Sequence, residues 1–281
     1  MAGVDLFIAG VFVAAIGAGL LGSLVGLGGG ILIVPLLSIG FGLDIRVAIG
    51  ASIVSVIATS SGAAAAYVRD HLTNIRVGML LELATSFGAV TGAFVAVYLN
   101  PRLLFILFGV ILLFSVVPTI KKIGEDIPQH VVDDRLAARL KLASTYPDRA
   151  QNRMVAYQVT HVPLGFGLMY VAGVVSGLLG IGSGALKVLA MDTAMRLPIK
   201  VSSATSNFMI GVTAAASAGI YFWRGDVLPV VAAPVALGIL IGATLGAKLL
   251  VHFRNTTVRL VFLPVLALVA LEMLLRGFGV L

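Results

Sequence analysis

A lysine interrupts a short apolar segment in the second half of the chain. Lys187 follows a glycine run at residues 180–184, which reads G-I-G-S-G. If a helix starts after this run, Lys187 lies about one turn beyond free N–H groups whose dipole already favours an anion. These residues predict a site for a small anion, with Lys187 as its fixed positive charge. The alternatives are that Lys187 pairs with Asp192 or extends toward a polar surface.

A second glycine run, G-L-G-G-G at residues 26–30, stands at the corresponding place in the first half. Each glycine inside a helix costs about 1 kcal/mol relative to alanine, so both runs predict places where a helix unwinds. Unwound backbone in an apolar environment is tolerated where it lines a cavity or is buried in protein. We expect the runs to bind substrate, with close helix packing as the alternative. The residues assigned to the site are Gly28, Gly29, Gly30, Gly182, Ser183 and Gly184.

Hydroxyl and amide groups follow the second run. In the stretch K-V-S-S-A-T-S-N at residues 200–207, Ser203, Ser206 and Asn207 share one helix face. They could complete the hydrogen bonds of an oxyanion, together with Ser52, the counterpart of Ser206 in the first half. Hydrogen bonding of these side chains to their own helix is the alternative. Glu82 is expected at a membrane interface, with a role as a proton-coupling site as the alternative.

The composition identifies the environment of these residues. Apolar residues form 59% and charged residues 11% of the 281-residue chain, against about 45–50% and 25% in soluble domains. The mean hydropathy is +1.11. The chain is therefore expected to be a multi-pass protein of the cell inner membrane, which excludes a soluble enzyme, a nucleic-acid-binding protein and a disordered tail. The net charge of +7 is attributed to Lys and Arg anchors at the ends of spans.

The apolar segments predict an all-α membrane protein. Eight segments are long enough to cross a bilayer, and two short ones, at about 30–43 and 184–195, follow the glycine runs, as the broken helices of transporters do. Each half thus has four long transmembrane helices and one short broken or re-entrant helix. The long segments lie at about 6–27, 47–68, 78–99, 103–120, 161–181, 201–223, 227–250 and 258–275.

The two halves match each other without a gap when residue n is aligned with residue n + 154, from about residue 18 to residue 93. Gly28 then meets Gly182, and Ser52 meets Ser206. Chance similarity between apolar segments would not keep glycine, serine, threonine and tyrosine in one register, so the match predicts an internal duplication.

Charge favours inverted halves. If the short segments cross the membrane, Lys and Arg divide 14 to 4 between its two sides; if they re-enter, the division is about 11 to 7. The positive-inside rule favours the first arrangement, with both termini outside and the central loop inside. The predicted domains are a first repeat at 1–120, a cytoplasmic loop at 121–160 and a second repeat at 161–281. Helical spacing at about 133–143 predicts a short amphipathic helix in this loop, with a flexible linker as the alternative.

The paired glycine motifs resemble those of a known family. The patterns G-L-G-G-G-I-L-I-V-P at 26–35 and G-L-L-G-I-G-S-G at 177–184 each precede a short apolar stretch and a helix that opens with Ala51-Ser52 or Thr205-Ser206. This arrangement resembles the TauE/SafE family of sulfite exporters, also called the toluenesulfonate uptake permease family. The resemblance implies an inner-membrane carrier for small sulfur-containing or organic anions.

We therefore predict a secondary transporter of sulfite, a sulfonate or a related oxyanion that works by alternating access. A passive anion channel is the main alternative, and an intramembrane hydrolase using Ser183 and His161 is a weaker one, because Ser183 aligns with Gly29 where a small residue suffices. The expected partners are a small anion and the lipid bilayer, with no cofactor, metal or nucleic acid. Proton or sodium coupling and a homodimer are left open.

Overall fold

The computed structural model describes residues 2–25, 30–121, 134–148, 153–250 and 255–280, and within them the chain is predominantly helical. The predicted segments agree with the observed helices to within a few residues. The first half contains α1 (Ala2–Val25), α2 (Gly30–Pro35), η1 (Leu36–Gly40), α3 (Ile45–Arg69), α4 (Ile75–Tyr98) and α5 (Pro101–Lys121). The second half contains α7 (Val162–Leu179), α8 (Gly184–Leu189), η2 (Ala190–Ala194), α9 (Ile199–Trp223), α10 (Pro229–Leu250) and α11 (Asn255–Gly277).

The two short segments are broken helices of the same design. In each, one and a half turns of α-helix pass directly into a five-residue π-helix, α2 into η1 and α8 into η2. The chain then turns back in the same way in both halves. Leu43 N donates to Leu37 O at 3.1 Å, and at the equivalent positions Leu197 N donates to Met191 O at 3.0 Å. The predicted short helices are therefore present.

Each half packs against the other through its long helices. α1 lies against α10, α4 against α7, α3 against α9 and α5 against α11. Glycine makes the closest approaches possible: a Cβ on Gly88 would lie 2.2 Å from the Tyr170 carbonyl oxygen, and one on Gly242 would lie 2.0 Å from the Ile16 carbonyl oxygen. Gly88 and Gly242 are 154 positions apart, as are Ile16 and Tyr170, so the two halves make equivalent contacts. These glycines therefore allow close packing of the helices.

The central loop is more structured than the sequence predicts. A helix is present, but α6 covers only Arg135–Arg139, and β1 (Ser144–Asp148) pairs antiparallel with β2 (Arg153–Tyr157) in a hairpin that was not expected. Tyr146 and Tyr157 are buried in one apolar cluster with Val77 and Leu81 of α4. The hairpin forms because alternate side chains of each strand can cover the end of α4.

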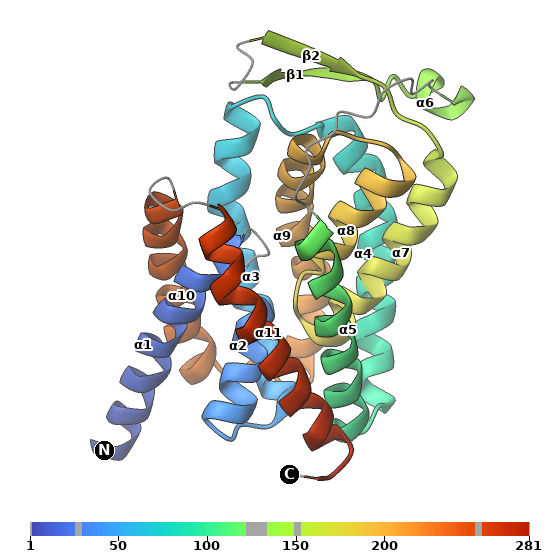
Figure 1. Cartoon of the computed structure of the whole chain (residues 1–281). Helices are drawn as coiled ribbons and strands as arrows, with labels where there is room; N and C mark the ends of the chain where they lie inside the picture. The colour runs from blue at the N-terminus through green and yellow to red at the C-terminus, as the bar shows by residue number, and fades with distance from the viewer. Residues whose placement is uncertain (1, 26–29, 122–133, 149–152, 251–254, 281) are drawn as a thin grey trace.

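Different elements lie at the two ends of the molecule. Figure 1 shows α1 beginning and α11 ending at the lower end, whereas α6 and the hairpin lie at the upper end. Among the described residues, α4 and α7 are long and apolar enough to cross a membrane, and shorter apolar helical stretches lie at Asp5–Leu21, Gly30–Gly40, Ile45–Ser61, Pro101–Phe114 and Pro229–Leu245. Large apolar side chains stay exposed on the outer faces, as a lipid-facing surface requires. They include Phe87, Phe94, Phe114 and Phe222.

Candidate functional site

The second glycine run is unwound. Gly180, Gly182 and Ser183 have φ angles of +66°, +72° and +44°, which place all three in the left-handed region. This conformation ends α7 at Leu179 and lets α8 begin at Gly184. The predicted break is confirmed here. Residues 26–29 of the first run, including Gly28 and Gly29, lie outside the described residues, and Gly30 is the first residue of α2.

One serine joins the broken segments of the two halves. The Ser52 hydroxyl on α3 lies 2.8 Å from the Gly180 carbonyl oxygen and 3.1 Å from the Gly30 carbonyl oxygen. Ser206 occupies the corresponding place on α9 and donates to the Gly184 carbonyl at 3.2 Å. The structure therefore brings Ser52 of α3 to Gly30 and Gly180, and Ser206 of α9 to Gly184.

The side chains of Ser183 and Asn207 donate hydrogen bonds to backbone carbonyls. Ser183 is buried, and its hydroxyl donates to the Ala172 carbonyl of α7 at 2.6 Å. The Asn207 amide donates to the Ser203 carbonyl one turn earlier in α9, at 2.9 Å. Asn207 therefore bonds to its own helix in this structure, which is the alternative that the sequence left open.

Gly182 lies where α3 and α9 meet. A Cβ on Gly182 would be 2.8 Å from Cγ2 of Ile210 on α9 and 3.1 Å from Cγ1 of Val56 on α3. The φ angle is also positive. Both the backbone conformation and the lack of space for a side chain therefore favour glycine at this position. The unwound segment thus passes through the middle of the helix bundle.

Lys187 is fully buried, with 0% of its surface exposed. Its ammonium group donates to the Thr213 hydroxyl of α9 at 2.5 Å, and Thr213 in turn donates to Oε1 of Glu82 on α4 at 2.8 Å. Glu82 also acts on Lys187 through its charge. In this structure Lys187 of α8 thus contacts α9, whereas the sequence offered pairing with Asp192 as an alternative.

Glu82 is the functional candidate that sequence reasoning misplaced. It was expected at an interface, yet only 8% of it is exposed, and its Oε1 accepts from both Thr213 and Ser86. Its other oxygen, Oε2, is buried without a hydrogen-bond partner among the described residues. The prediction for Glu82 failed because α4 begins at Ile75 rather than at residue 78. Glu82 therefore lies about 10 Å inside the helix.

The geometry does not support the hydrolase alternative. His161 is the exposed N-cap of α7, whereas Ser183 follows the other end of this 18-residue helix, which is about 27 Å long. A base must come within hydrogen-bond distance of its nucleophile. The described residues also contain no group of three side chains that could hold a metal ion.

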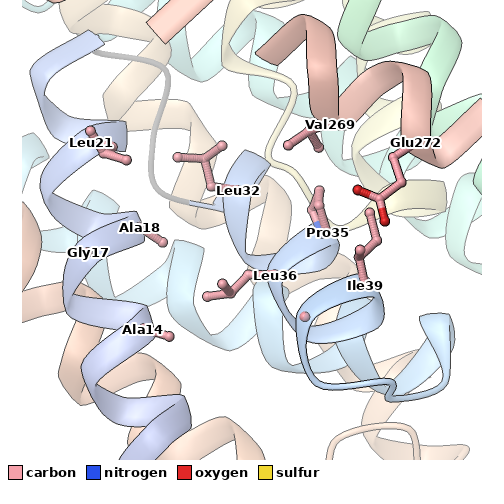
Figure 2. A pocket seen from close by; sticks show the side chains of 11 residues that line it. Ala14, Gly17, Ala18, Leu21, Leu32, Pro35, Leu36, Ile39, Val269 and Glu272 are labelled. Carbon is pink, nitrogen blue, oxygen red and sulfur yellow. The ribbon is translucent and has the colours of Figure 1, made fainter. Parts of the chain in front are cut away.

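A separate cavity of about 390 Å³ opens between α1, α2, η1 and α11. Its walls are apolar except for one carboxylate, and Figure 2 shows Glu272 directed toward Pro35 and Ile39. Glu272 also lies 3.7 Å from Arg276, one turn later on α11. None of the residues that contact Lys187 lines this cavity, so it is distinct from the lysine site.

Comparison with known proteins identifies the family. A family model described as "Sulfite exporter TauE/SafE" matches residues 11–273. The chain belongs to the TauE/SafE family. It is 28% identical over 269 residues to the probable membrane transporter protein YunE of Bacillus subtilis (strain 168), covering 92% of this chain and 94% of YunE. It is 26% identical over 231 residues to the probable membrane transporter protein YdhB of the same organism, covering 82% and 85%. No solved structure shows a significant match.

This membership confirms the resemblance drawn from the glycine motifs. The described fold and the names of its TauE/SafE relatives agree that the chain is a helical membrane transporter protein.

Proposed function

We propose that this TauE/SafE protein is a secondary transporter of the cell inner membrane that carries a small sulfur-containing or organic anion, such as sulfite or a sulfonate, by alternating access. The observation that carries the proposal is the fully buried Lys187 beside the unwound segment between α7 and α8. A charge inside a membrane protein costs several kcal/mol unless a partner satisfies it, so such charges mark substrate or ion pathways.

Ser52 and the unwound backbone support an anion site close to Lys187. The unwound segment at 180–183 begins at Gly180, which Ser52 contacts. It leads into α8, where Lys187 lies one turn from the start. In the occupied state, an oxyanion would take N–H groups of Lys187 and hydroxyls of α9, replacing their present bonds within the protein. The predicted substrate residues Ser203, Ser206 and Asn207 lie on this helix.

We further propose that the two halves are inverted repeats. α1 runs from the lower end upward and α7 from the upper end downward in Figure 1. The pairing of α1 with α10 and of α7 with α4 is what a twofold relation between the halves would produce, since α1 corresponds to α7 and α4 to α10. Rocking of one set of helices against the other would expose a fixed central site to each side in turn.

A passive channel is the competing function, and the burial of Lys187 argues against it. A conducting pore keeps its selective groups in contact with water, whereas Lys187 is closed off from solvent. The test is counterflow in proteoliposomes: unlabelled sulfite or methanesulfonate inside should accelerate entry of the labelled anion, and the entry rate should saturate. Flux that rises linearly, without acceleration by internal anion, would contradict a carrier, and flux equal to empty liposomes would contradict transport of these anions.

The role of Lys187 can be tested by Lys187→Met, which keeps length and removes charge. Loss of a charge-assisted hydrogen bond of about 1.5–3 kcal/mol should weaken methanesulfonate binding about ten- to a hundredfold in calorimetry. Lys200→Met, at the start of α9, is the matched control and should bind normally. If Lys187 only balances Glu82, the double variant Lys187→Met/Glu82→Gln should recover binding, and this would remove Lys187 from the site.

A further inference from the structure

We propose that Glu82 is the proton site of this transporter and that one proton binds to it with each monovalent anion that binds at Lys187. The inference rests on the proposed anion transport and adds the coupling ion and the charge of the substrate. It follows from a buried chain of three side chains on three helices, Lys187 on α8, Thr213 on α9 and Glu82 on α4.

The chain links the two charges through a single hydroxyl. Lys187 Nζ lies 2.5 Å from Thr213 Oγ1, which lies 2.8 Å from Glu82 Oε1. The Met209 carbonyl oxygen, at 2.9 Å, and Thr85 Oγ1, at 3.3 Å, are further neighbours of the Thr213 hydroxyl. Any ligand that draws Lys187 away from Thr213 therefore weakens the attraction between the charges of Lys187 and Glu82.

Both charged groups retain unused bonding capacity. An ammonium group has three N–H donors, and within the described residues the Lys187 ammonium uses one, to Thr213. Oε2 of Glu82 is buried and has no partner in the same part of the chain. The free N–H groups can take the oxygens of an anion, and Oε2 can take a proton, so the site has one place for each.

Charge balance connects the two events. Without substrate, Lys187 and Glu82 form a neutral pair. A monovalent anion at Lys187 would leave the buried site with one net negative charge, which is costly at low dielectric. A proton taken from water onto Glu82 restores neutrality, because a neighbouring negative charge favours the protonated carboxyl. The site is then neutral while the helices rock between the two open states, whether it is empty or loaded.

No other charged side chain offers this compensation from the helices packed around Glu82. α4 packs against α7 and α9. α7 carries no charged residue, and the charged residue of α9 is Lys200, about 20 Å along the helix from Thr213. On α4 itself, Arg76 lies at the first turn, where it donates to the Lys141 carbonyl. Within the described residues, the balance is therefore between Glu82 and Lys187.

The same balance predicts which anions are carried. A sulfonate has one negative charge and gives a neutral loaded site with one proton. Sulfate has two negative charges and would leave the site with one unbalanced charge. Methanesulfonate should therefore bind in preference to sulfate, by at least tenfold.

The first experiment measures proton uptake on binding to the wild-type protein. Methanesulfonate takes up no proton itself near neutral pH, so calorimetry in two buffers of different ionisation enthalpy reports only protons bound by the protein. We expect about one proton per anion at a pH where Glu82 is ionised in the empty site. Binding without proton uptake from pH 5 to 8 would overturn the inference, whatever the behaviour of any variant.

The second experiment separates coupling from transport in proteoliposomes that contain a pH dye and labelled methanesulfonate. Glu82→Gln preserves side-chain shape, so it should keep anion exchange within about threefold of wild type while proton entry with the anion falls to the level of empty liposomes. Glu272→Gln, a second glutamate on a membrane helix, should keep both activities. Proton entry that persists in Glu82→Gln would overturn the inference.

The outcomes distinguish the two proposals. If the wild-type protein neither exchanges nor takes up sulfite or methanesulfonate, the proposed transport fails. If the wild-type protein transports methanesulfonate but moves no protons with it, transport stands and the role of Glu82 fails. Loss of both activities in Glu82→Gln, with wild-type expression and melting temperature, would also count against a coupling role, since exchange does not require net proton movement.

Discussion

Ser52 is the side chain that holds the two unwound segments together. Its hydroxyl lies between the carbonyl oxygens of Gly30 and Gly180, which belong to different halves of the chain. The Gly180 carbonyl lies at the C-terminal end of α7, where carbonyl oxygens lack helical partners, and the Gly30 carbonyl lies at the first residue of α2. A small hydroxyl on α3 can satisfy them without widening the space between the segments. The stability of the centre of the bundle should therefore depend on the Ser52 hydroxyl group.

Ser52→Ala should therefore destabilise the protein. Removal of the hydroxyl leaves buried carbonyl oxygens without this partner, at a cost of about 1–3 kcal/mol. The melting temperature of the purified protein in detergent should fall. Ser61→Ala is the matched control, because the Ser61 hydroxyl is exposed and bonds to Ile57 on its own helix. Equal melting temperatures for Ser52→Ala and Ser61→Ala would contradict the bridging role.

Gly182→Leu should abolish transport while protein still accumulates in the membrane. The side chain would have to fit beside Ile210 and Val56, at a φ angle of +72° that costs a non-glycine residue about 1–2 kcal/mol. Gly167→Leu on α7 is the control, because a Cβ there meets no atom within 4 Å. Counterflow of methanesulfonate is the measurement. Normal counterflow by Gly182→Leu would show that the run serves packing alone.

At the scale of elements, one aspartate fastens the loop helix to the bundle. Asp134 caps α6 by accepting from the Ala137 amide at 2.6 Å, and its second oxygen accepts from the Val162 amide at the start of α7 at 3.0 Å. Burial opposes ionisation of this carboxyl, but backbone hydrogen bonds from Ala137, Val162 and Leu136, together with the charge of His161, outweigh it and hold its pKa below the ordinary value of 3.8. The charged form is thus the one that joins α6 to α7.

The stability supplied by Asp134 should depend on pH with a defined sign. A lowered folded-state pKa means that the contribution is complete above the ordinary pKa and is lost as the pH falls through the folded-state value. Wild type should melt above Asp134→Asn at pH 7, and the difference should shrink below about pH 4. Asp5→Asn, at the exposed start of α1, is the control. A difference that stays constant down to pH 3 would contradict this role.

The sequence predicts the helices well because long apolar segments must be helical in a membrane, whatever their neighbours. It also locates the broken segments, since glycine runs weaken a helix locally. It does not locate the hairpin, because strands that cover a helix end in water have no strong apolar run. It also misplaces Glu82, because pattern alone does not tell which helix faces which: the contact with Thr213 joins residues 131 positions apart.

At the scale of the whole molecule, the positive residues divide by the end at which they lie. Arg46, which donates to the Leu99 carbonyl at 2.9 Å, belongs with the end where α3 begins and α4 ends. Arg76 donates to the Lys141 carbonyl and belongs with the end that carries α6 and the hairpin. Figure 1 places this second end opposite the start of α1 and the end of α11. This division is what the proposed inverted topology predicts.

The positive-inside rule then indicates which end faces the cytoplasm. The end with α6 and the hairpin collects most of the Lys and Arg residues, so it should be inside and both termini outside. Because the chain contains no cysteine, single cysteines can report this without background. Arg139→Cys should resist an impermeant maleimide added to intact cells and react after permeabilisation, whereas Phe278→Cys, exposed beyond α11, should react from outside.

Arg139 is itself one of the positive residues on which the topology prediction rests. A second variant is therefore needed that keeps this charge and reports the same location. Ala138→Cys, also exposed on α6, keeps every positive charge and should give the same labelling as Arg139→Cys. One lost charge should not reverse the orientation, because the division of 14 to 4 leaves a large excess on the inner side. Labelling of Ala138→Cys in intact cells would place the hairpin outside and would overturn the topology, and with it the direction from which the proton and the anion enter.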